Sequence, residues 1–551
     1  MTLGWQLALA FVLSLLVLVG LIGWLQNVHI LTANGMYKAV QAEPWIADPA
    51  HARLDPSNYL YFPLYGALAR GLDALGILRG VAWKQFAYLN AFWASLGIVF
   101  VYGFVHRLTA GSIGAAVLAA CFHFGCGFVL LLSVINEDIM PGYVLVLASM
   151  LLAGLWFGRP NYTRVAIVGT LFTLGWLIEW RLIFPTLPAL VLALALAEGR
   201  LRYRLTMIAV LIAYILAVSG IVQLLWEGHN GAVGLHDMLW TGKGIATGWA
   251  GLGWDKAWMM LSGVGNYFLI VGGFVDTLSA KAAALPLALS VLLQLAIFVV
   301  CLVVLWPRRA ERRLWTVAAV FLGTLGAGQV MNLYSQPQDP QMQVNVMPWL
   351  TVAWALLCAA LLSRPRVLPR IGLVLAVLSL APLAWNVAKL ARWRGGDTAA
   401  LAAVSAIGQR FPPESTVFLY WGFEPVTTWQ YALWSHSWDW DGAATIAPAP
   451  SADPRFKWIA VDGGAIRHPQ WTAAEHAASI KHDIDLALDR GYKVAVSDVW
   501  AWNVDHLAGQ LGILSAANRA AAIHAMLHAN YQATPVFSEP TVGTYYELRR
   551  R

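Results

Sequence analysis

Apolar runs of about twenty residues alternate with short polar loops along the first two thirds of the chain. A helix needs about twenty apolar residues to cross the hydrocarbon core of a bilayer. The pattern predicts a polytopic α-helical membrane protein. Its spans, about eleven in all, are expected near residues 4–25, 84–106, 112–134, 140–158, 165–179, 182–197, 205–226, 286–306, 315–333, 347–363 and 370–390.

Four of the apolar stretches differ from ordinary membrane spans. The segments 165–179 and 182–197 are short for full spans, and Glu179-Trp180-Arg181 lies between them. The charges at this tip predict a helical hairpin that ends below the outer surface. The stretches 60–80 and 257–278 are not counted as spans. We expect the first to be an interfacial helix and the second to be interfacial or re-entrant.

Arginine is concentrated in one set of loops. These loops begin near residues 106, 159, 198, 307 and 363. The positive-inside rule places all five in the cytoplasm, together with the N-terminus. The loops 26–83 and 227–285 and everything after about residue 391 then lie on the outer side. The alanine-rich, arginine-over-lysine composition is typical of a high-GC bacterial genome and favours the plasma (inner) membrane.

Composition bears on the class of partner and on the division into domains. The chain has 551 residues, 59% of them hydrophobic, and a net charge of +7, but its basic residues lie in short loops and do not indicate a nucleic-acid partner. After residue 391, strand-like stretches at 416–420, 458–461, 493–496 and 544–548 alternate with helical patterns at 472–490 and 515–530. The sequence therefore predicts a membrane domain over 1–390 and an extracytoplasmic α/β domain over 391–551.

Two acidic clusters are predicted on the outer side. Glu137 and Asp138 follow Asn136 in a very short loop, and Asp48 and Asp55 lie in the loop 26–83. Carboxylates beside hydrocarbon are costly, so they indicate function. Asp55, or failing it Asp48, is a candidate general base towards an acceptor hydroxyl or amine. The alternative is that both start ordinary turns, because each precedes a proline.

The other candidates suit substrate binding. Glu137 and Asp138 have the oxygen ligands for a divalent metal such as Mg²⁺ or Mn²⁺, or could orient a substrate amine or a sugar hydroxyl. The alternative is a solvated loop that caps the next helix. Arg181 and Lys243 could bind phosphate, unless Arg181 pairs with Glu179 and Lys243 is only solvated. Asp339 lies in an amide-rich loop that could bind sugar hydroxyls or serve as a polar connector.

The layout resembles the GT-C superfamily of membrane glycosyltransferases. The resemblance rests on Asp48 and Asp55, on the stretch Asn58-Tyr-Leu-Tyr-Phe-Pro-Leu-Tyr65 before an amphipathic helix, and on Glu137-Asp138. It implies transfer of a sugar from a polyprenyl-phosphate-linked donor to a glycan, lipid or protein acceptor at the outer face. Many members carry a carboxylate a few positions after the first span, where this chain has Thr32-Ala-Asn34, so the choice between Asp55 and Asp48 stays open.

A second hypothesis is a transporter or flippase for a lipid-linked or amphiphilic solute, because intramembrane charges also mark transport routes. The acidic residues lie at the predicted outer face instead of mid-span, and no inverted repeat is visible, which favours the transferase. A scaffold with a carbohydrate-binding outer domain is a third hypothesis.

Overall fold

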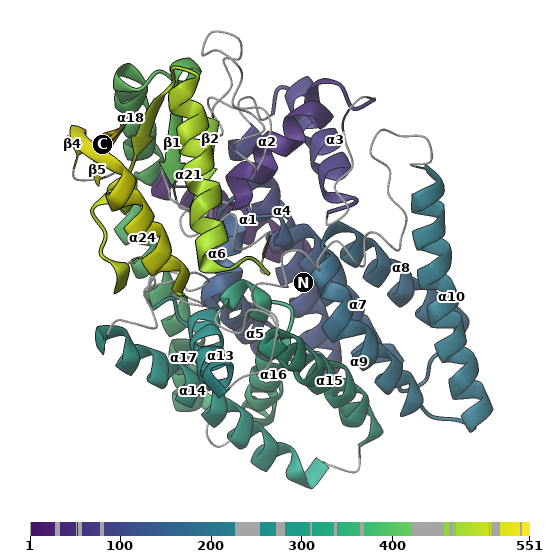
Figure 1. Ribbon diagram of the computed structural model, residues 1–551. Helices are drawn as coiled ribbons and strands as arrows, with labels where there is room; N and C mark the ends of the chain where they lie inside the picture. Colours follow the sequence, from purple (N-terminus) through teal and green to yellow (C-terminus); the bar gives the residue numbers. More distant parts are fainter. Residues whose placement is uncertain are drawn as a thin grey trace. The chain divides into compact units, whose positions relative to one another are not determined.

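The computed structural model describes residues 2–27, 34–50, 52, 58–77, 82–225, 254–271, 281–308, 311–334, 339–363, 368–420, 457–461, 468, 470–505, 507, 518–539 and 543–551. The chain divides into two compact units (Figure 1). The first comprises Met1–Leu25, Pro44–Trp240 and Gly251–Arg394. The second contains Gly395–Arg551 and the earlier segment Gln26–Glu43.

The first unit is helical throughout its described residues. Its principal helices are α1 (Leu3–Leu25), α3 (Tyr61–Ala74), α4 (Ala82–Leu108), α5 (Ile113–Gly125), α6 (Gly127–Val134), α7 (Ile139–Trp156), α8 (Tyr162–Ile178), α9 (Ile183–Ala195), α10 (Leu201–Leu225), α13 (Trp254–Phe268), α14 (Lys281–Leu305), α15 (Arg312–Tyr334), α16 (Pro348–Leu362) and α17 (Leu368–Leu390). Short 3₁₀ turns lie at η1 (Trp180–Leu182), η2 (Trp306–Arg308), η3 (Pro340–Gln343) and η4 (Ala391–Trp393), and α2 (Asn34–Ala47) contains the junction between the units.

The predicted polytopic character is confirmed, but the number eleven is not established. Among the described residues, seven helices are long and apolar enough to cross a membrane, and an eighth span arises if α5 and α6, bent by 70° at Cys126, count as one. Three further apolar helices, α8, α9 and α16, are shorter. The α8–η1–α9 sequence coincides with the predicted hairpin. Helix α3 corresponds to the predicted interfacial helix, and α13 ends at Phe268, ten residues before the expected boundary.

Helix α7 is the most enclosed candidate span. In its most apolar window 78% of the residues are buried, against 11% in α1 and 22% in α14. Helices such as α1 and α14 expose large side chains including Leu16 and Val303. Exposed aliphatic faces of this kind are what a lipid-facing helix requires. The chain therefore places its acidic tripeptide, which precedes Ile139, at the N-terminal end of the most enclosed candidate span among the described residues.

Close packing of α7 on α8 depends on two glycines. A Cβ atom at Gly142 would lie 2.8 Å from the carbonyl oxygen of Gly175 and 3.1 Å from Cβ of Glu179. A Cβ atom at Gly175 would lie 2.6 Å from Cγ2 of Val146. Small residues let membrane helices approach closely. This approach brings the end of α8, where Glu179 lies, to the start of α7.

The second unit is an α/β structure (Figure 1). Its described elements are α18 (Gly396–Arg410), η5 (Pro413–Ser415), β1 (Thr416–Tyr420), β2 (Lys457–Ala460), α21 (Ala473–Asp489), β3 (Lys493–Val496), η8 (Asp498–Trp500), α24 (Arg519–Asn530), β4 (Tyr531–Glu539) and β5 (Gly543–Arg550). The sheet order is β2-β1-β3-β5-β4. Strand β1 pairs in parallel with β2 and β3, while β3–β5 and β5–β4 are antiparallel.

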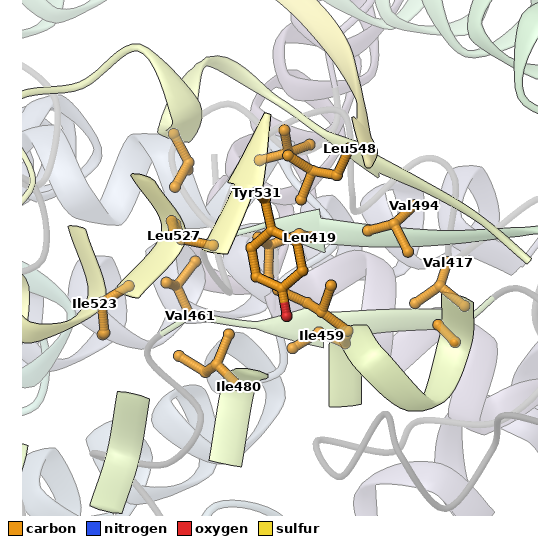
Figure 2. Close-up of a cluster of buried hydrophobic side chains, with 14 of the residues drawn as sticks. Val417, Leu419, Ile459, Val461, Ile480, Val494, Ile523, Leu527, Tyr531 and Leu548 are labelled. Atoms are coloured by element: carbon orange, nitrogen blue, oxygen red, sulfur yellow. The ribbon is translucent and has the colours of Figure 1, made fainter. Parts of the chain in front are cut away.

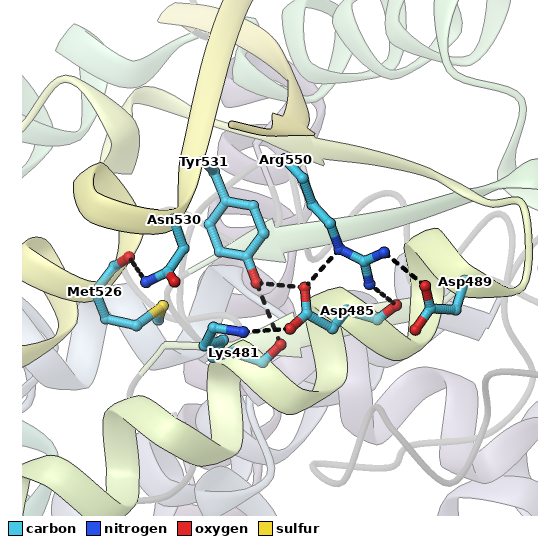
Figure 3. Close-up of polar contacts among 7 residues, drawn as sticks. All are labelled: Lys481, Asp485, Asp489, Met526, Asn530, Tyr531 and Arg550. Carbon is cyan, nitrogen blue, oxygen red and sulfur yellow. Dashed lines mark hydrogen bonds and ion pairs between the residues drawn. The ribbon is translucent and has the colours of Figure 1, made fainter.

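Helices α21 and α24 contribute to the apolar core of this sheet. Val417, Leu419, Ile459 and Val494 come from the strands and meet Ile480 of α21 among the buried residues (Figure 2). At the end of β5, Arg550 donates to Asp485 at 3.0 Å and to Asp489 at 2.6 Å (Figure 3). The hydroxyl of Tyr531 also donates to Asp485, at 3.0 Å. These bonds fasten α21 to the antiparallel part of the sheet.

Candidate active site

The acidic tripeptide lies in the first unit, in the connection from α6 to α7. Asn136, Glu137 and Asp138 are 1%, 0% and 1% exposed, so this is not a solvated loop. Asp138 occupies the N-cap position of α7, but its side chain makes no capping hydrogen bond. The positive end of a helix dipole favours carboxylates near this end. Their burial still requires specific partners, because an uncompensated buried charge is very costly.

Two amides from distant loops supply such partners. Nε2 of Gln341 donates to Oε1 of Glu137 at 3.0 Å. Nδ2 of Asn58 donates to Oδ2 of Asp138 at 3.0 Å, and lies 3.4 Å from Oε2 of Glu179. Asn58 is just before α3 and Gln341 is in η3. Three separate connections therefore meet at the start of α7.

The cation of the site is Arg181, held by Glu179. Nε and Nη2 of Arg181 donate to the two carboxylate oxygens of Glu179 at 2.6 and 2.9 Å, and Nη1 lies 3.9 Å from Sδ of Met342. Burial disfavours the charged guanidinium, but Glu179, and then Asp138 and Asp339, raise the pKa of Arg181 above its ordinary value. The ion pair with Glu179, which was the alternative interpretation of Arg181, is therefore present. It fixes the guanidinium among carboxylates, with 22% of the side chain exposed.

Asp339 completes the charged cluster. It is 3% exposed and precedes η3, where its Oδ1 accepts the backbone N–H of Gln341 at 2.7 Å. Burial raises the pKa of Asp339 to about 6, although the hydrogen bond from Gln341 and the charge of Arg181 act in the opposite direction. This carboxyl group therefore changes its charge close to neutral pH, beside the guanidinium of Arg181.

The backbone of the acidic tripeptide is held separately by Asn90 of α4. Nδ2 of Asn90 donates to the carbonyl oxygens of Ile135 and Glu137 at 2.8 and 2.6 Å. The hydroxyl of Tyr65, in α3, donates to Oδ1 of Asn90 and so fixes the orientation of its amide. Hydrogen bonds to the side chains and to the main chain thus both position the carboxylates.

The structure brings together four of the seven residues predicted from the sequence. Glu137, Asp138 and Arg181 lie in one buried cluster with Asp339, the last of them through its charge effect on Arg181. Asp48 is exposed, immediately after α2. Asp55 and Lys243 lie outside the described residues.

The polar partners Asn58, Asn90 and Gln341 were not predicted as site residues. Asn58 begins the stretch that carries the resemblance, and Gln341 belongs to the amide-rich loop, so the sequence contained a signal for both. Asn90 lies inside an apolar helix, where a lone amide is the signal.

The described residues do not by themselves form a metal centre at Glu137 and Asp138. No group of three or more His, Cys, Asp or Glu side chains suited to a metal occurs in the described part of the chain. Each of the two carboxylates already accepts an amide hydrogen bond, and the oxygens of Glu179 are bonded to Arg181. Mg²⁺ requires near-octahedral oxygen ligation, which two such groups do not supply alone.

The fold matches solved membrane glycosyltransferases. No protein-family model matches the sequence, and no curated protein matches it. The oligosaccharyltransferase of Archaeoglobus fulgidus, crystallised with Zn and sulfate, superposes with a TM-score of 0.54 at 14% identity, covering 98% of this chain and 72% of that chain. ArnT from Cupriavidus metallidurans, bound to undecaprenyl phosphate, superposes with a TM-score of 0.53 at 14% identity, covering 99% of this chain and 98% of that one.

These likenesses show the fold alone. The chain is a multi-pass membrane protein whose fold is similar to that of these two solved proteins. The resemblance drawn from the sequence is thereby confirmed at the level of the fold, and the substrates of the two solved proteins remain statements about those proteins.

Proposed function

We propose that this protein is a membrane glycosyltransferase that moves a sugar from a polyprenyl-phosphate-linked donor to a glycan, lipid or protein acceptor on the outer face of the membrane. The observation that supports it best is the buried cluster at the start of α7. There the amide of Asn58 joins Asp138 to Glu179, which pairs with Arg181, and the neighbouring Glu137 accepts from Gln341. In a GT-C fold this combines hydrogen-bond acceptors for a hydroxyl with a cation for phosphate.

The proposed step balances as follows. The acceptor oxygen bonds to the anomeric carbon of the donor sugar, and the bond from that carbon to the phosphate oxygen breaks. The acceptor proton passes to a carboxylate acting as general base, and the bonding electrons leave with the polyprenyl phosphate. Arg181 stabilises the charge that develops on the phosphate, because a fixed guanidinium is most effective where charge appears in the transition state. Lys243 is proposed as a second phosphate contact.

Asp55 is proposed as the base, with Asp48 as the alternative. Asn58 is three residues after Asp55 in the sequence and bonds to Asp138 in the buried cluster. This short separation in sequence from Asn58 supports Asp55 over Asp48. Asp48 is ten residues before Asn58 and exposed. Asp339 and Gln341, in the loop between α15 and α16, are proposed to bind sugar hydroxyls.

The carboxylates also favour transfer over transport. They lie in connections at the ends of helices, between α6 and α7, after α8 and before η3, instead of along the middle of a span. A transporter site is expected near the bilayer midplane. We further propose that these connections face the outside of the plasma membrane, with the N-terminus in the cytoplasm and residues 391–551 as an extracytoplasmic domain.

A transfer assay tests the proposal. Purified protein in nanodiscs receives radiolabelled undecaprenyl-phosphate-linked hexoses and pentoses with a membrane lipid and glycan extract. Asp55→Asn and Glu137→Gln should lower product formation by about 10² to 10⁴. Glu311→Gln, which alters an exposed carboxylate paired with Arg308, should leave it unchanged. Full activity in both site variants would contradict the proposal.

An EDTA arm of the same assay addresses the metal hypothesis at Glu137 and Asp138. Transfer that stops in EDTA and returns with added Mg²⁺ or Mn²⁺ would assign a divalent metal to the reaction. Transfer that is indifferent to EDTA would remove the metal from the proposal.

A further inference from the structure

The side chain of Tyr61 is an unexplained polar group beside the acidic cluster. Tyr61 is the first residue of α3 and is 0% exposed. Its hydroxyl has no hydrogen-bond partner among the residues that the structure describes. A buried hydroxyl without a partner is unfavourable, and such groups in native proteins call for an explanation.

The start of α3 is joined to the carboxylates through Asn58. The backbone N–H of Tyr61 donates to the carbonyl oxygen of Asn58 at 3.0 Å, and the side chain of Asn58 bonds to Asp138. The backbone N–H of Leu60 donates to the carbonyl oxygen of Leu177 at 2.9 Å, in the last turn of α8. Tyr61 is thus attached through its own main chain to the segment that carries the site.

The ring of Tyr61 is held in place on its other side. It stacks on Tyr65 with ring centroids 4.5 Å apart, and Phe86 of α4 lies edge-on at 6.1 Å. Tyr65 in turn bonds to Asn90, which holds the carbonyl groups of the acidic tripeptide. An aromatic side chain with these contacts is rigid, so its hydroxyl has a fixed position without an acceptor to explain it.

The charges around Tyr61 determine what it can bind. Burial, then Tyr65, and then Asp138 and Glu137 raise the pKa of Tyr61 well above its ordinary value, so the phenol keeps its proton and acts as a donor. A phosphate at this position would meet the negative charges of both carboxylates. A sugar hydroxyl is complementary, because it accepts the O–H of a tyrosine and donates its own proton to a carboxylate.

We propose that Tyr61 is a substrate-binding residue whose hydroxyl donates to a sugar hydroxyl that in turn donates to Glu137 or Asp138. This inference rests on the proposed function and names a contact within it. The hydroxyl belongs either to the sugar of the lipid-linked donor or to a sugar of the acceptor. The pair formed by a neutral phenol and a carboxylate selects for a hydroxyl over a methyl group or a hydrogen atom at that position.

The test compares two conservative variants in nanodiscs. Tyr61→Phe removes only the hydroxyl. Tyr59→Phe is the matched control, because Tyr59 is 1% exposed and its hydroxyl also lacks a partner among the described residues, yet burial alone raises its pKa. Neither variant should lower the melting temperature, since each removes a hydroxyl that forms no hydrogen bond with the described residues. A structural role for Tyr61 would instead lower it.

Binding is then measured with undecaprenyl phosphate and with undecaprenyl-phosphate-linked glucose, mannose and arabinose. We expect Tyr61→Phe to weaken the binding of the sugar-bearing lipids about tenfold and to leave the binding of undecaprenyl phosphate unchanged. Tyr59→Phe should bind all of these lipids like the unaltered protein. Unchanged donor binding with a raised KM for the acceptor would place the hydroxyl on the acceptor sugar.

Unchanged binding and KM for every sugar in Tyr61→Phe would overturn the role of Tyr61, with the proposed function intact. If the unaltered protein binds none of the lipids, the proposed function fails and this inference fails with it.

Discussion

The side-chain amide of Gln341 donates to Oε1 of Glu137 at 3.0 Å, joining two residues that are 204 positions apart. The same loop places Asp339 beside this contact, where its Oδ1 accepts the backbone N–H of Gln341. The loop before α16 is thus hydrogen-bonded to the acidic tripeptide that precedes α7. A site built from connections far apart in sequence is rigid only if such hydrogen bonds form.

Replacing Gln341 by alanine should lower transfer about tenfold. The change removes a hydrogen bond to a buried carboxylate, which is stronger than a bond between neutral groups. The measurement is kcat/KM for the lipid-linked donor. Gln329→Ala is the control, because Gln329 donates to Gln343 of the same loop at 2.6 Å and has no hydrogen bond to a carboxylate among the described residues. Equal losses in both variants would mean that the loop, and not Glu137, is what matters.

Loss of Arg181 should destabilise the protein by about 3–5 kcal/mol. Arg181→Met leaves Glu179 buried and unpaired, whereas the double variant with Glu179→Met removes both charges. We expect the double variant to recover most of the melting temperature in detergent. We also expect neither variant to recover binding of undecaprenyl phosphate, because the proposed phosphate contact is absent from both.

A double variant that binds undecaprenyl phosphate as well as the unaltered protein would remove Arg181 from phosphate recognition. The ion pair would then be purely structural.

Asp339 should make the stability of the protein depend on pH. Its pKa is raised to about 6 in the folded chain, from an ordinary value near 4 in the unfolded chain. The folded state therefore binds more protons between about pH 4 and pH 6, and stability falls as the pH rises through this window. Asp339→Asn keeps an acceptor for Gln341 but cannot ionise.

The measurement is the melting temperature of both proteins from pH 4 to pH 7.5. As the pH rises across this range, the free energy of unfolding of Asp339→Asn should increase by on the order of 3 kcal/mol relative to that of the unaltered protein. Parallel pH profiles would show that the burial of Asp339 has no energetic consequence.

Gly142→Ala should reduce both stability and activity. The new methyl group would lie 2.8 Å from the carbonyl oxygen of Gly175 and 3.1 Å from Cβ of Glu179, so α8 must move away from α7. Overpacking of this kind costs about 1–3 kcal/mol. Gly220→Ala in α10, where no atom lies within 4 Å of the added methyl group, is the control and should behave like the unaltered protein. Normal activity in Gly142→Ala would mean that the spacing of Glu179 from α7 is not critical.

Much of the fold could be predicted from local pattern. Apolar runs near twenty residues gave the long helices, and the strand-like segment 416–420 is β1. The bend between α5 and α6 was not predicted, because the run 112–134 is apolar throughout and only Gly125-Cys126-Gly127 signals the break. Strand β4 was missed as well. It contains Pro535, which an edge strand tolerates, and it lies at the edge of the sheet.

The site was predicted in part, and the division has a physical reason. Glu137, Asp138, Arg181 and Asp339 stood out because charge is rare next to hydrocarbon. Their partners Asn58 and Gln341 are neutral amides, which carry no such signal, and they reach the carboxylates only through tertiary contacts across 80 and 204 residues.

The most direct measurement follows the label of a radiolabelled undecaprenyl-phosphate-linked sugar in proteoliposomes supplied with acceptor extract. We predict that the label leaves the polyprenyl phosphate and appears covalently on an acceptor, and that Asp55→Asn and Glu137→Gln lower this transfer by about 10² to 10⁴. Label that stays on the lipid while it moves between the leaflets would contradict a glycosyltransferase and identify a flippase.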